Sequence, residues 1–147
     1  MADLHPFFVH FPIALLIVAA GFDTFGAIAS RQPHHRTAYS IQVIAGLFAL
    51  LAAFTGNQAE TRLLEQPELL QVVLTVFDRH VSLGNAMIWI IIILAVGRTF
   101  AILERKSWGL GGWVFPLMSI LVAGLILGTG LLGGELSREI LNFYKSP

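Results

Sequence analysis

The chain of 147 residues contains no cysteine and only 12% charged residues. The absence of cysteine excludes disulfides, zinc knuckles, iron–sulfur ligands and covalently attached haem. Soluble domains contain roughly 25% charged residues, about twice the fraction found here. Because so little charge cannot cover a water-facing surface, the composition nearly excludes a soluble enzyme domain.

An excess of positive charge is also lacking. Nine Lys and Arg residues balance nine Asp and Glu residues, so the formal net charge is zero and a nucleic acid finds no basic footprint. The chain also lacks a Ser-His-Asp pattern, a phosphate-binding loop and an HExxH motif. These absences argue against a nucleic-acid partner, a hydrolase and a nucleotide-dependent enzyme.

Apolar residues, by contrast, make up 56% of the chain, and the mean hydropathy is +0.76. They are concentrated in four stretches, each long enough for the ~20 helical residues that cross a bilayer. None of the four shows the alternation of a membrane barrel strand. The sequence therefore predicts a single all-α transmembrane domain over residues 1–147, with helices at about 6–30, 37–58, 80–100 and 109–134.

The short connections favour an up-down-up-down four-helix bundle, with the first and third helices on a diagonal. Helix association in lipid depends on small residues that allow close contact. Gly46 in the second helix and Gly124 and Gly128 in the fourth helix supply such positions. They are interpreted either as helix contacts or as a thin wall beside a bulky flat ligand.

The longest connection, residues 57–78, is divided by Pro67. Beyond Pro67, apolar and polar residues alternate irregularly, which is typical of a short amphipathic helix lying in the membrane interface. This segment is interpreted as a cover for the bundle or, alternatively, as a docking surface for a partner.

Basic residues in short loops indicate the orientation of a membrane protein. The connections after the first and third helices contain five of them: Arg31, Arg36, Arg98, Arg105 and Lys106. The opposite face contains four, so both termini are predicted to lie outside the cytoplasm. His34 and His35 belong to the first of these loops and are expected to contact water or lipid headgroups.

The remaining histidines carry the functional hypothesis. His10 lies at the start of the first predicted helix and His80 at the start of the third. Helices that start on the same face are parallel, so the two side chains are expected at one depth, opposed across the bundle centre. Two opposed neutral imidazoles are suited to be the axial ligands of a haem iron. The alternatives are an interfacial role for His10 and a helix N-terminal role for His80.

Two further residues are candidates for the same site. His5, next to Pro6, is expected outside the helix, as a loop ligand, as a hydrogen-bond partner of a haem propionate, or without a role. Glu135 follows the fourth helix at a similar depth and would complete a metal site or orient a histidine. The alternative for Glu135 is a surface pair with Arg138.

Asp23 is the one acid well inside a predicted helix. Ionisable groups at membrane depth are costly and often functional. Asp23 is interpreted as an ion-pair partner of Arg36 or Arg98, with a proton-relay role as the alternative. Gln42 in the second helix is interpreted as an interhelical hydrogen-bonding residue.

The segment HPFFVHFPIALLIVAAGFD, from His5 to Asp23, resembles domain-of-unknown-function family 2231. This family comprises small bacterial four-helix membrane proteins that open with HP-x-x-VHFPI. Two shorter elements of its pattern match His80 with Gly84, and Gly133 with Gly134, whereas the C-terminal SREILNFYKSP departs from it. The resemblance implies a bacterial inner-membrane protein, and the Rieske and cytochrome domains of some relatives imply electron transfer.

The sequence thus predicts a membrane-embedded b-type haem protein that carries electrons near the outer leaflet, rather than a stand-alone enzyme. His10 and His80 are the expected axial ligands, assisted by His5, and the haem wall is expected to consist of Gly46, Gly124 and Gly128. One alternative is a cofactor-free structural or assembly subunit of a larger membrane complex. The other is a transition metal held by His5, His10, His80 and Glu135. The expected partners are the lipid bilayer and a cytochrome, Rieske or other redox subunit, and a homo- or hetero-oligomer is left open.

Overall fold

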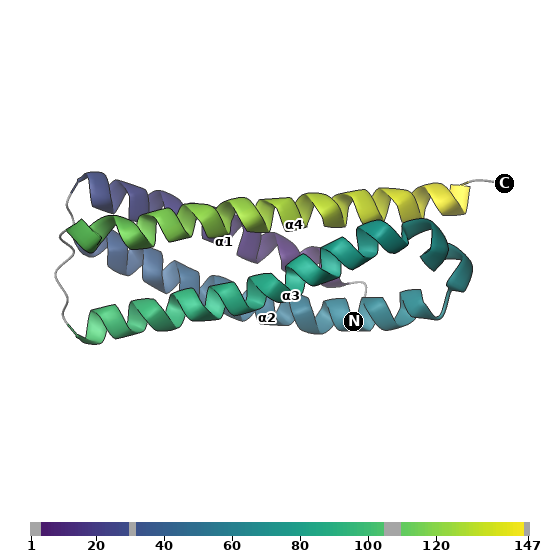
Figure 1. Ribbon diagram of the computed structural model, residues 1–147, viewed down its shortest axis with the longest axis horizontal. Helices are drawn as coiled ribbons and strands as arrows, with labels where there is room; N and C mark the ends of the chain where they lie inside the picture. The colour runs from purple at the N-terminus through teal and green to yellow at the C-terminus, as the bar shows by residue number, and fades with distance from the viewer. Residues whose placement is uncertain (1–3, 30–31, 105–109, 146–147) are drawn as a thin grey trace.

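The computed structural model describes residues 4–29, 32–104 and 110–145, and these residues form helices and no strand. The helices are α1 (His5–Ile28), α2 (Gln32–Leu64), α3 (Pro67–Leu103), the short 3-10 helix η2 (Leu110–Trp113) and α4 (Val114–Lys145). Figure 1 shows the four long helices side by side along the length of the molecule. The predicted all-α four-helix bundle is confirmed.

The bundle has the predicted diagonal arrangement. α1 packs against α2 and α4, and α3 packs against the same two helices. Within the described residues, no Cα atom of α1 lies within 8 Å of one in α3, and the same holds for α2 and α4. Side chains of α1 and α3 therefore meet only through the centre of the bundle.

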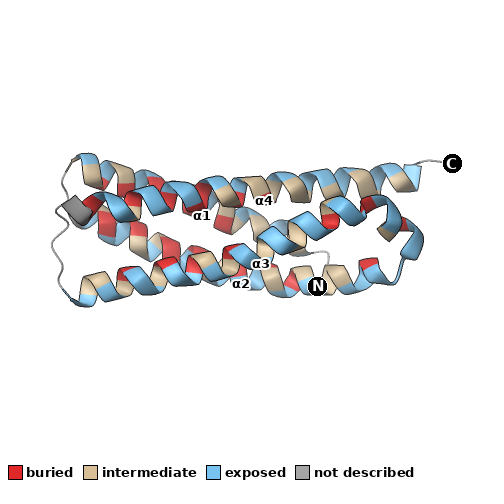
Figure 2. Cartoon of the chain, viewed as in Figure 1, coloured by how far each residue is buried: buried red, intermediate tan, exposed pale blue. Residues whose placement is uncertain are grey.

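All four long helices are apolar enough to cross a membrane. Figure 2 shows buried residues facing the bundle centre and exposed residues on the outer faces. The outer faces include large apolar side chains such as Leu47, Ile93 and Leu121. Since backbone groups of a helix are satisfied internally, such faces are stable against hydrocarbon, and the chain is a multi-pass membrane protein in contact with lipid.

The helices differ in length. α1 has 24 residues and α3 has 37, so that at 1.5 Å per residue they measure about 36 Å and about 55 Å. Figure 1 shows that α1 begins partway along the bundle, while α2, α3 and α4 continue beyond it. We call the part formed by residues 57–64, 67–79 and 134–145 the three-helix extension.

The three-helix extension replaces the separate interfacial helix expected within residues 57–78. Residues 57–64 are the last turns of α2, and α3 runs without a break from Pro67. Leu69, Val73 and Phe77 recur every fourth residue and therefore share one face of α3. With Leu63 they form a buried cluster, against which Leu136, Ile140 and Phe143 of α4 pack. These apolar residues thus bury themselves against protein rather than in the interface.

The glycines chosen from the sequence do not supply the main helix contacts. A Cβ atom added at Gly124 or Gly128 meets nothing within 4 Å, and one at Gly46 comes within 3.4 Å of Ile91 Cγ2 only. Buried alanines are concentrated in α1 and α2 instead: Ala19, Ala20, Ala38, Ala45, Ala49 and Ala52. Alanine allows close approach without the conformational cost that glycine adds to a helix.

Replacing Leu69 by alanine tests the packing of the three-helix extension. Leu69 is 3% exposed, so the substitution is expected to lower the free energy of unfolding in detergent micelles by about 2–5 kcal/mol. Leu74→Ala, at a position that is 45% exposed on the same helix, should change it by about 0.5 kcal/mol or less. Equal effects of the two substitutions would contradict the buried cluster.

Candidate functional site

A cavity of about 450 Å³ lies between the four helices where α1 begins. Its volume falls within the roughly 300–1,000 Å³ typical of ligand pockets. Most of its walls are apolar. Its polar or ionisable lining residues are His5, His10, Asn57, Glu60, His80, Asn85, Thr129 and Ser137.

Two histidines face each other at this cavity. His5 lies in the first turn of α1 and His80 lies on α3, the helix diagonally opposite. Their ring centroids are 6.2 Å apart and their planes are inclined at 78°. The expectation that His5 would lie outside the helix is therefore wrong, because α1 begins at His5 and accommodates Pro6 in its first turn.

Each imidazole is hydrogen-bonded to a backbone carbonyl of a neighbouring helix, α2 for His5 and α4 for His80. His5 Nδ1 lies 2.9 Å from the carbonyl oxygen of Ala52 on α2. His80 Nδ1 lies 3.1 Å from the carbonyl oxygen of Thr129 on α4. A carbonyl only accepts hydrogen bonds, so Nδ1 is the donor and, in the neutral ring, Nε2 keeps its lone pair. No hydrogen bond joins either Nε2 to the residues that the structure describes, and both atoms are therefore suited to bind a metal.

Glycines on α2 and α4 make room for the two rings. A Cβ atom at Gly56 would stand 3.0 Å from His5 Cε1, and one at Gly133 would stand 3.0 Å from His80 Cε1. Both glycines line the cavity, as do Gly84, Gly130 and Gly134. The lining does not include the three glycines that the sequence analysis assigned to the haem wall, namely Gly46, Gly124 and Gly128.

His10 is not the residue that faces His80. It lines the same cavity but is exposed, and its Nδ1 bonds the carbonyl oxygen of Pro6 on its own helix. His10 follows His5 by five positions, which places the two side chains about 140° apart around α1. Only one of them can point at the bundle centre, and the structure gives this position to His5.

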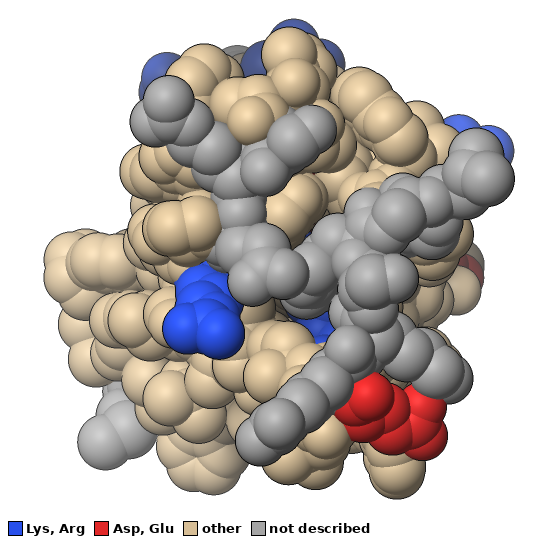
Figure 3. Space-filling model, turned by 90° about the vertical axis from the view of Figure 1, so that its left-hand side faces the viewer, with Lys and Arg blue, Asp and Glu red and all other residues tan. Residues whose placement is uncertain are grey.

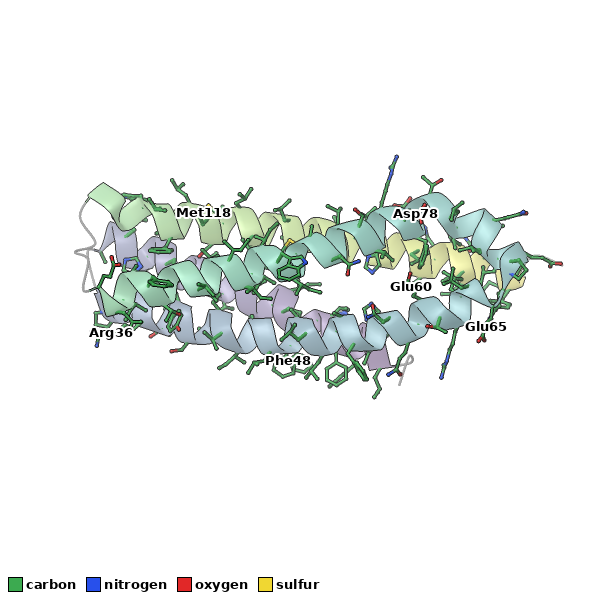
Figure 4. All side chains as sticks on the ribbon, turned by 60° about the horizontal axis from the view of Figure 1, so that its bottom comes forward. Arg36, Phe48, Glu60, Glu65, Asp78 and Met118 are labelled. Carbon is green, nitrogen blue, oxygen red and sulfur yellow. The ribbon has the colours of Figure 1, made fainter. Side chains whose placement is uncertain are left out.

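The acids near the cavity also differ from the expectation. Glu135 is exposed and does not line the cavity, whereas Glu60 of α2 does. Figure 4 shows Glu60 on the side of α2 that faces α3 and α4, and Asp78 pointing away from the bundle. Among the described residues, no group of three or more His, Asp or Glu side chains is arranged to hold a metal ion. The structure thus does not gather the four residues proposed for a transition-metal site.

A second polar centre lies toward the other end of the bundle. Asp23 of α1 forms an ion pair with Arg98 of α3 and accepts hydrogen bonds from Ser119 Oγ at 2.6 Å and from His35 Nδ1 at 3.1 Å. Arg98 Nη1 donates to Gln42 Oε1 at 3.0 Å. We call these five residues, which come from all four long helices, the Asp23 cluster.

The Asp23 cluster is buried: Asp23 and Arg98 are 0% exposed, and the other three members are at most 5% exposed. Asp23 was expected to pair with Arg36 or Arg98, and it pairs with Arg98. The expected hydrogen bond between helices through Gln42 is confirmed. His35, which was expected in a solvated loop, is also part of the cluster. Gly26 makes room for it, since a Cβ atom there would stand 3.1 Å from His35 Nε2.

The two polar centres are linked by helix periodicity. His5 precedes Asp23 by 18 residues on α1, and His80 precedes Arg98 by 18 residues on α3. Eighteen residues make five turns of an α-helix and about 27 Å. His5 therefore lies on the same face of α1 as Asp23, and His80 lies on the same face of α3 as Arg98. This equal spacing is the feature of the sequence from which the inward position of His5 could have been predicted.

Burial of Arg98 also removes one basic residue from the surface at the end of the bundle that carries the α1–α2 and α3–α4 connections. This end faces the viewer in Figure 3, where most of the side chains of the described residues are uncharged. Arg36 is exposed there, whereas Arg98 is enclosed in the Asp23 cluster. The other three basic residues used for the orientation, Arg31, Arg105 and Lys106, lie outside the described residues.

Comparison with known proteins identifies a family but no characterised relative. A family model described as Predicted membrane protein (DUF2231) matches residues 2–140. No curated protein and no solved structure matches the chain.

Arg98→Met tests the energetic role of the Asp23 cluster. The substitution leaves Asp23 as a buried charge without its partner, and the free energy of unfolding in detergent should fall by about 3–5 kcal/mol. Arg36→Met is the matched control, because Arg36 is exposed, and should change it by about 0.5 kcal/mol or less.

A double variant separates loss of the ion pair from loss of arginine packing. Asp23→Asn combined with Arg98→Met removes both charges, and it should be more stable than Arg98→Met alone, with a coupling energy of about 0.5–3 kcal/mol. Strictly additive single and double variants would refute the pairing.

Proposed function

Because the chain belongs to domain-of-unknown-function family 2231, its function has to be inferred from its own site, and we propose that it binds b-type haem between His5 and His80 and carries electrons. The observation that carries this proposal is the pair of opposed imidazoles. The cofactor is non-covalent, since the chain has no cysteine for thioether attachment.

The number of ligands favours haem over a free metal ion. Structural and catalytic zinc sites use three or four protein ligands, whereas the described residues bring only two imidazoles together here. Two axial ligands suffice for haem, whose macrocycle binds the iron at the remaining positions. The centroids of the two rings are 6.2 Å apart.

The surroundings of the two rings also suit a flat apolar group. The cavity is mainly apolar, and glycines on α2, α3 and α4 contribute to its lining. Haem would supply one-electron chemistry, while the protein holds and orients it and tunes its potential. The carbonyl oxygens of Ala52 and Thr129 fix the orientation of the two imidazoles and raise their basicity.

The proposal includes a location and a partner. Both termini lie on the outer side of a bacterial inner membrane, and the cavity lies in the outer half of the bundle. Without the buried Arg98, the connections on the opposite side keep four basic residues, Arg31, Arg36, Arg105 and Lys106, which equals the number on the side of the termini, so this orientation is proposed without support from the count of basic residues. The partner is a cytochrome, a Rieske protein or another membrane redox subunit that exchanges electrons with the bound haem.

An absorption spectrum of the protein, purified after expression with ample haem, tests the proposal. The wild-type protein should show a Soret band and the spectrum of low-spin iron with two histidine ligands. His5→Ala and His80→Ala should each lower haem occupancy by at least about tenfold, because even loss of a hydrogen-bond partner of a metal ligand lowers affinity about 10–100-fold.

His10→Ala and His34→Ala are the matched controls and should retain the wild-type spectrum. Retention by His5→Ala together with loss by His10→Ala would assign the axial position to His10, against the geometry. A wild-type protein without any Soret band would reject the haem function and leave a cofactor-free structural subunit.

The glycines provide an independent test of the position of the cofactor. A side chain at Gly133 would displace the His80 ring, so Gly133→Leu should lower haem occupancy as measured by the Soret absorbance. Gly124→Leu adds the same side chain to the same helix at a position with open space outside the cavity, and it should retain full occupancy. Equal haem contents of the two variants would place the cofactor elsewhere.

A further inference from the structure

We propose that α3 binds a second copy of this chain inside the membrane, through Ser82, Asn85 and Trp89. We call these three residues the polar stripe of α3. The proposal goes beyond the haem function and does not depend on it, since it concerns the outer face of α3.

The polar stripe points away from the bundle centre. Ser82, Asn85 and Trp89 are exposed, Trp89 to 66%. They follow one another at intervals of three and four residues and therefore share one face of α3. Trp89 is nine residues from both His80 and Arg98, which amounts to about 180° around the helix. Because His80 and Arg98 face the centre, Trp89 faces the opposite direction. Asn85, about 140° from His80, also contributes to the cavity lining.

Trp89 lies at a depth where its indole N–H has no partner in the bilayer. Nine residues of helix measure about 13.5 Å, so Trp89 lies midway between His80 and Arg98 along α3. Tryptophan in membrane proteins is enriched at the two interfaces, where the N–H reaches water or headgroups. Hydrocarbon offers no hydrogen-bond acceptor. The depth of Trp89 is thus explained by a protein partner rather than by anchoring at an interface.

The polar stripe differs in hydrogen bonding from comparable side chains of the bundle. In the four long helices outside the three-helix extension, every other hydroxyl or amide side chain that the structure describes has a partner. Thr24 and Thr129 bond carbonyl oxygens of their own helices, and Gln42 and Ser119 bond within the Asp23 cluster. No hydrogen bond joins the three side chains of the polar stripe to the described part of the chain. Polar groups left unpaired in an apolar environment are unfavourable, so the stripe requires a partner.

The chemistry of the polar stripe favours a second copy of this chain as that partner. The three side chains carry no charge. A carboxamide and a hydroxyl each contain a donor and an acceptor, so Asn85 and Ser82 are each able to pair with the same residue of another copy. In a two-fold symmetric contact, identical residues of the two copies meet near the axis. Trp89 only donates, and the carboxamide oxygen of Asn85 in the second copy, one helical turn away, is a suitable acceptor.

The size of the neighbouring side chains is compatible with this contact. Ser82 and Ala86 are both exposed and four residues apart. Small residues at this spacing allow membrane helices to approach closely, and hydrogen bonds between helices then add to the van der Waals contact. The polar stripe thus combines close approach with self-complementary hydrogen bonding.

Disulfide formation by single-cysteine variants of the full chain tests the proposal. The chain has no cysteine of its own, so a disulfide in such a variant must join two copies. Ser82→Cys should form a covalent dimer when it is oxidised with copper–phenanthroline in phosphatidylcholine vesicles at a large excess of lipid.

Phe7→Cys is the matched control. Phe7 is 58% exposed and follows His5 by two positions, as Ser82 follows His80, so it points outward at a similar depth. It lies on α1, the helix diagonal to α3. Because a preformed contact raises the effective concentration of the two thiols, Ser82→Cys should react about tenfold faster than Phe7→Cys or more.

Variants of the other two residues separate hydrogen bonding from mere proximity. In the Ser82→Cys background, Asn85→Leu and Trp89→Phe should each weaken the dimer by about 3–30-fold, the range expected for hydrogen bonds between membrane helices. The measured quantity is the protein-to-lipid ratio at which half of the protein is cross-linked. Asn85→Gln keeps the amide and should retain most of the dimer.

Equal rates in Ser82→Cys and Phe7→Cys would overturn the proposal. So would a dimer that neither Asn85→Leu nor Trp89→Phe weakens, because its contact would not involve the polar groups. Ser82→Cys protein that stays monomeric in vesicles but is cross-linked to a different protein in native membranes would overturn the second copy as the partner. All these outcomes are independent of haem content, so failure of this proposal is distinguishable from failure of the haem function.

Discussion

The buried ion pair between Asp23 and Arg98 is the constraint on which the arrangement of this bundle depends. No water reaches either charge, and the two residues belong to helices that meet only through the bundle centre. Rotation of α1 or α3 would leave an uncompensated charge at membrane depth, which is far more costly than poor packing of apolar side chains. Arg98 donates a hydrogen bond to Gln42 of α2, and Ser119 of α4 donates one to Asp23, so the same constraint extends to all four helices.

The histidine cavity follows from this constraint. With Asp23 and Arg98 turned toward the centre, the residues five turns before them also face the centre, and these residues are His5 and His80. The ion pair thus positions two imidazoles about 27 Å away without contacting them. Their remaining freedom is removed by the carbonyl oxygens of Ala52 and Thr129.

Composition and hydropathy were sufficient to predict the four helices, because length and apolar character determine which segments cross a bilayer, and the short connections were sufficient to predict their diagonal order. They did not predict the three-helix extension. The four-residue spacing of Leu69, Val73 and Phe77 was present in the sequence, but a bilayer interface and a protein surface bury such a face equally well. The expectation that His10 would face His80 was wrong for a different reason, because depth in the membrane was considered and rotation around α1 was not.

The equal spacing on α1 and α3 makes the length of these segments as important as their composition. Deleting one residue between His5 and Asp23 would turn everything before the deletion by about 100°, so that an apolar side chain would replace the imidazole while the hydropathy of the helix stayed the same. Point changes among the lipid-facing residues of α1 are tolerable, whereas insertions and deletions in this segment are not. Substitutions should therefore accumulate across these turns in related proteins while the number of residues stays constant.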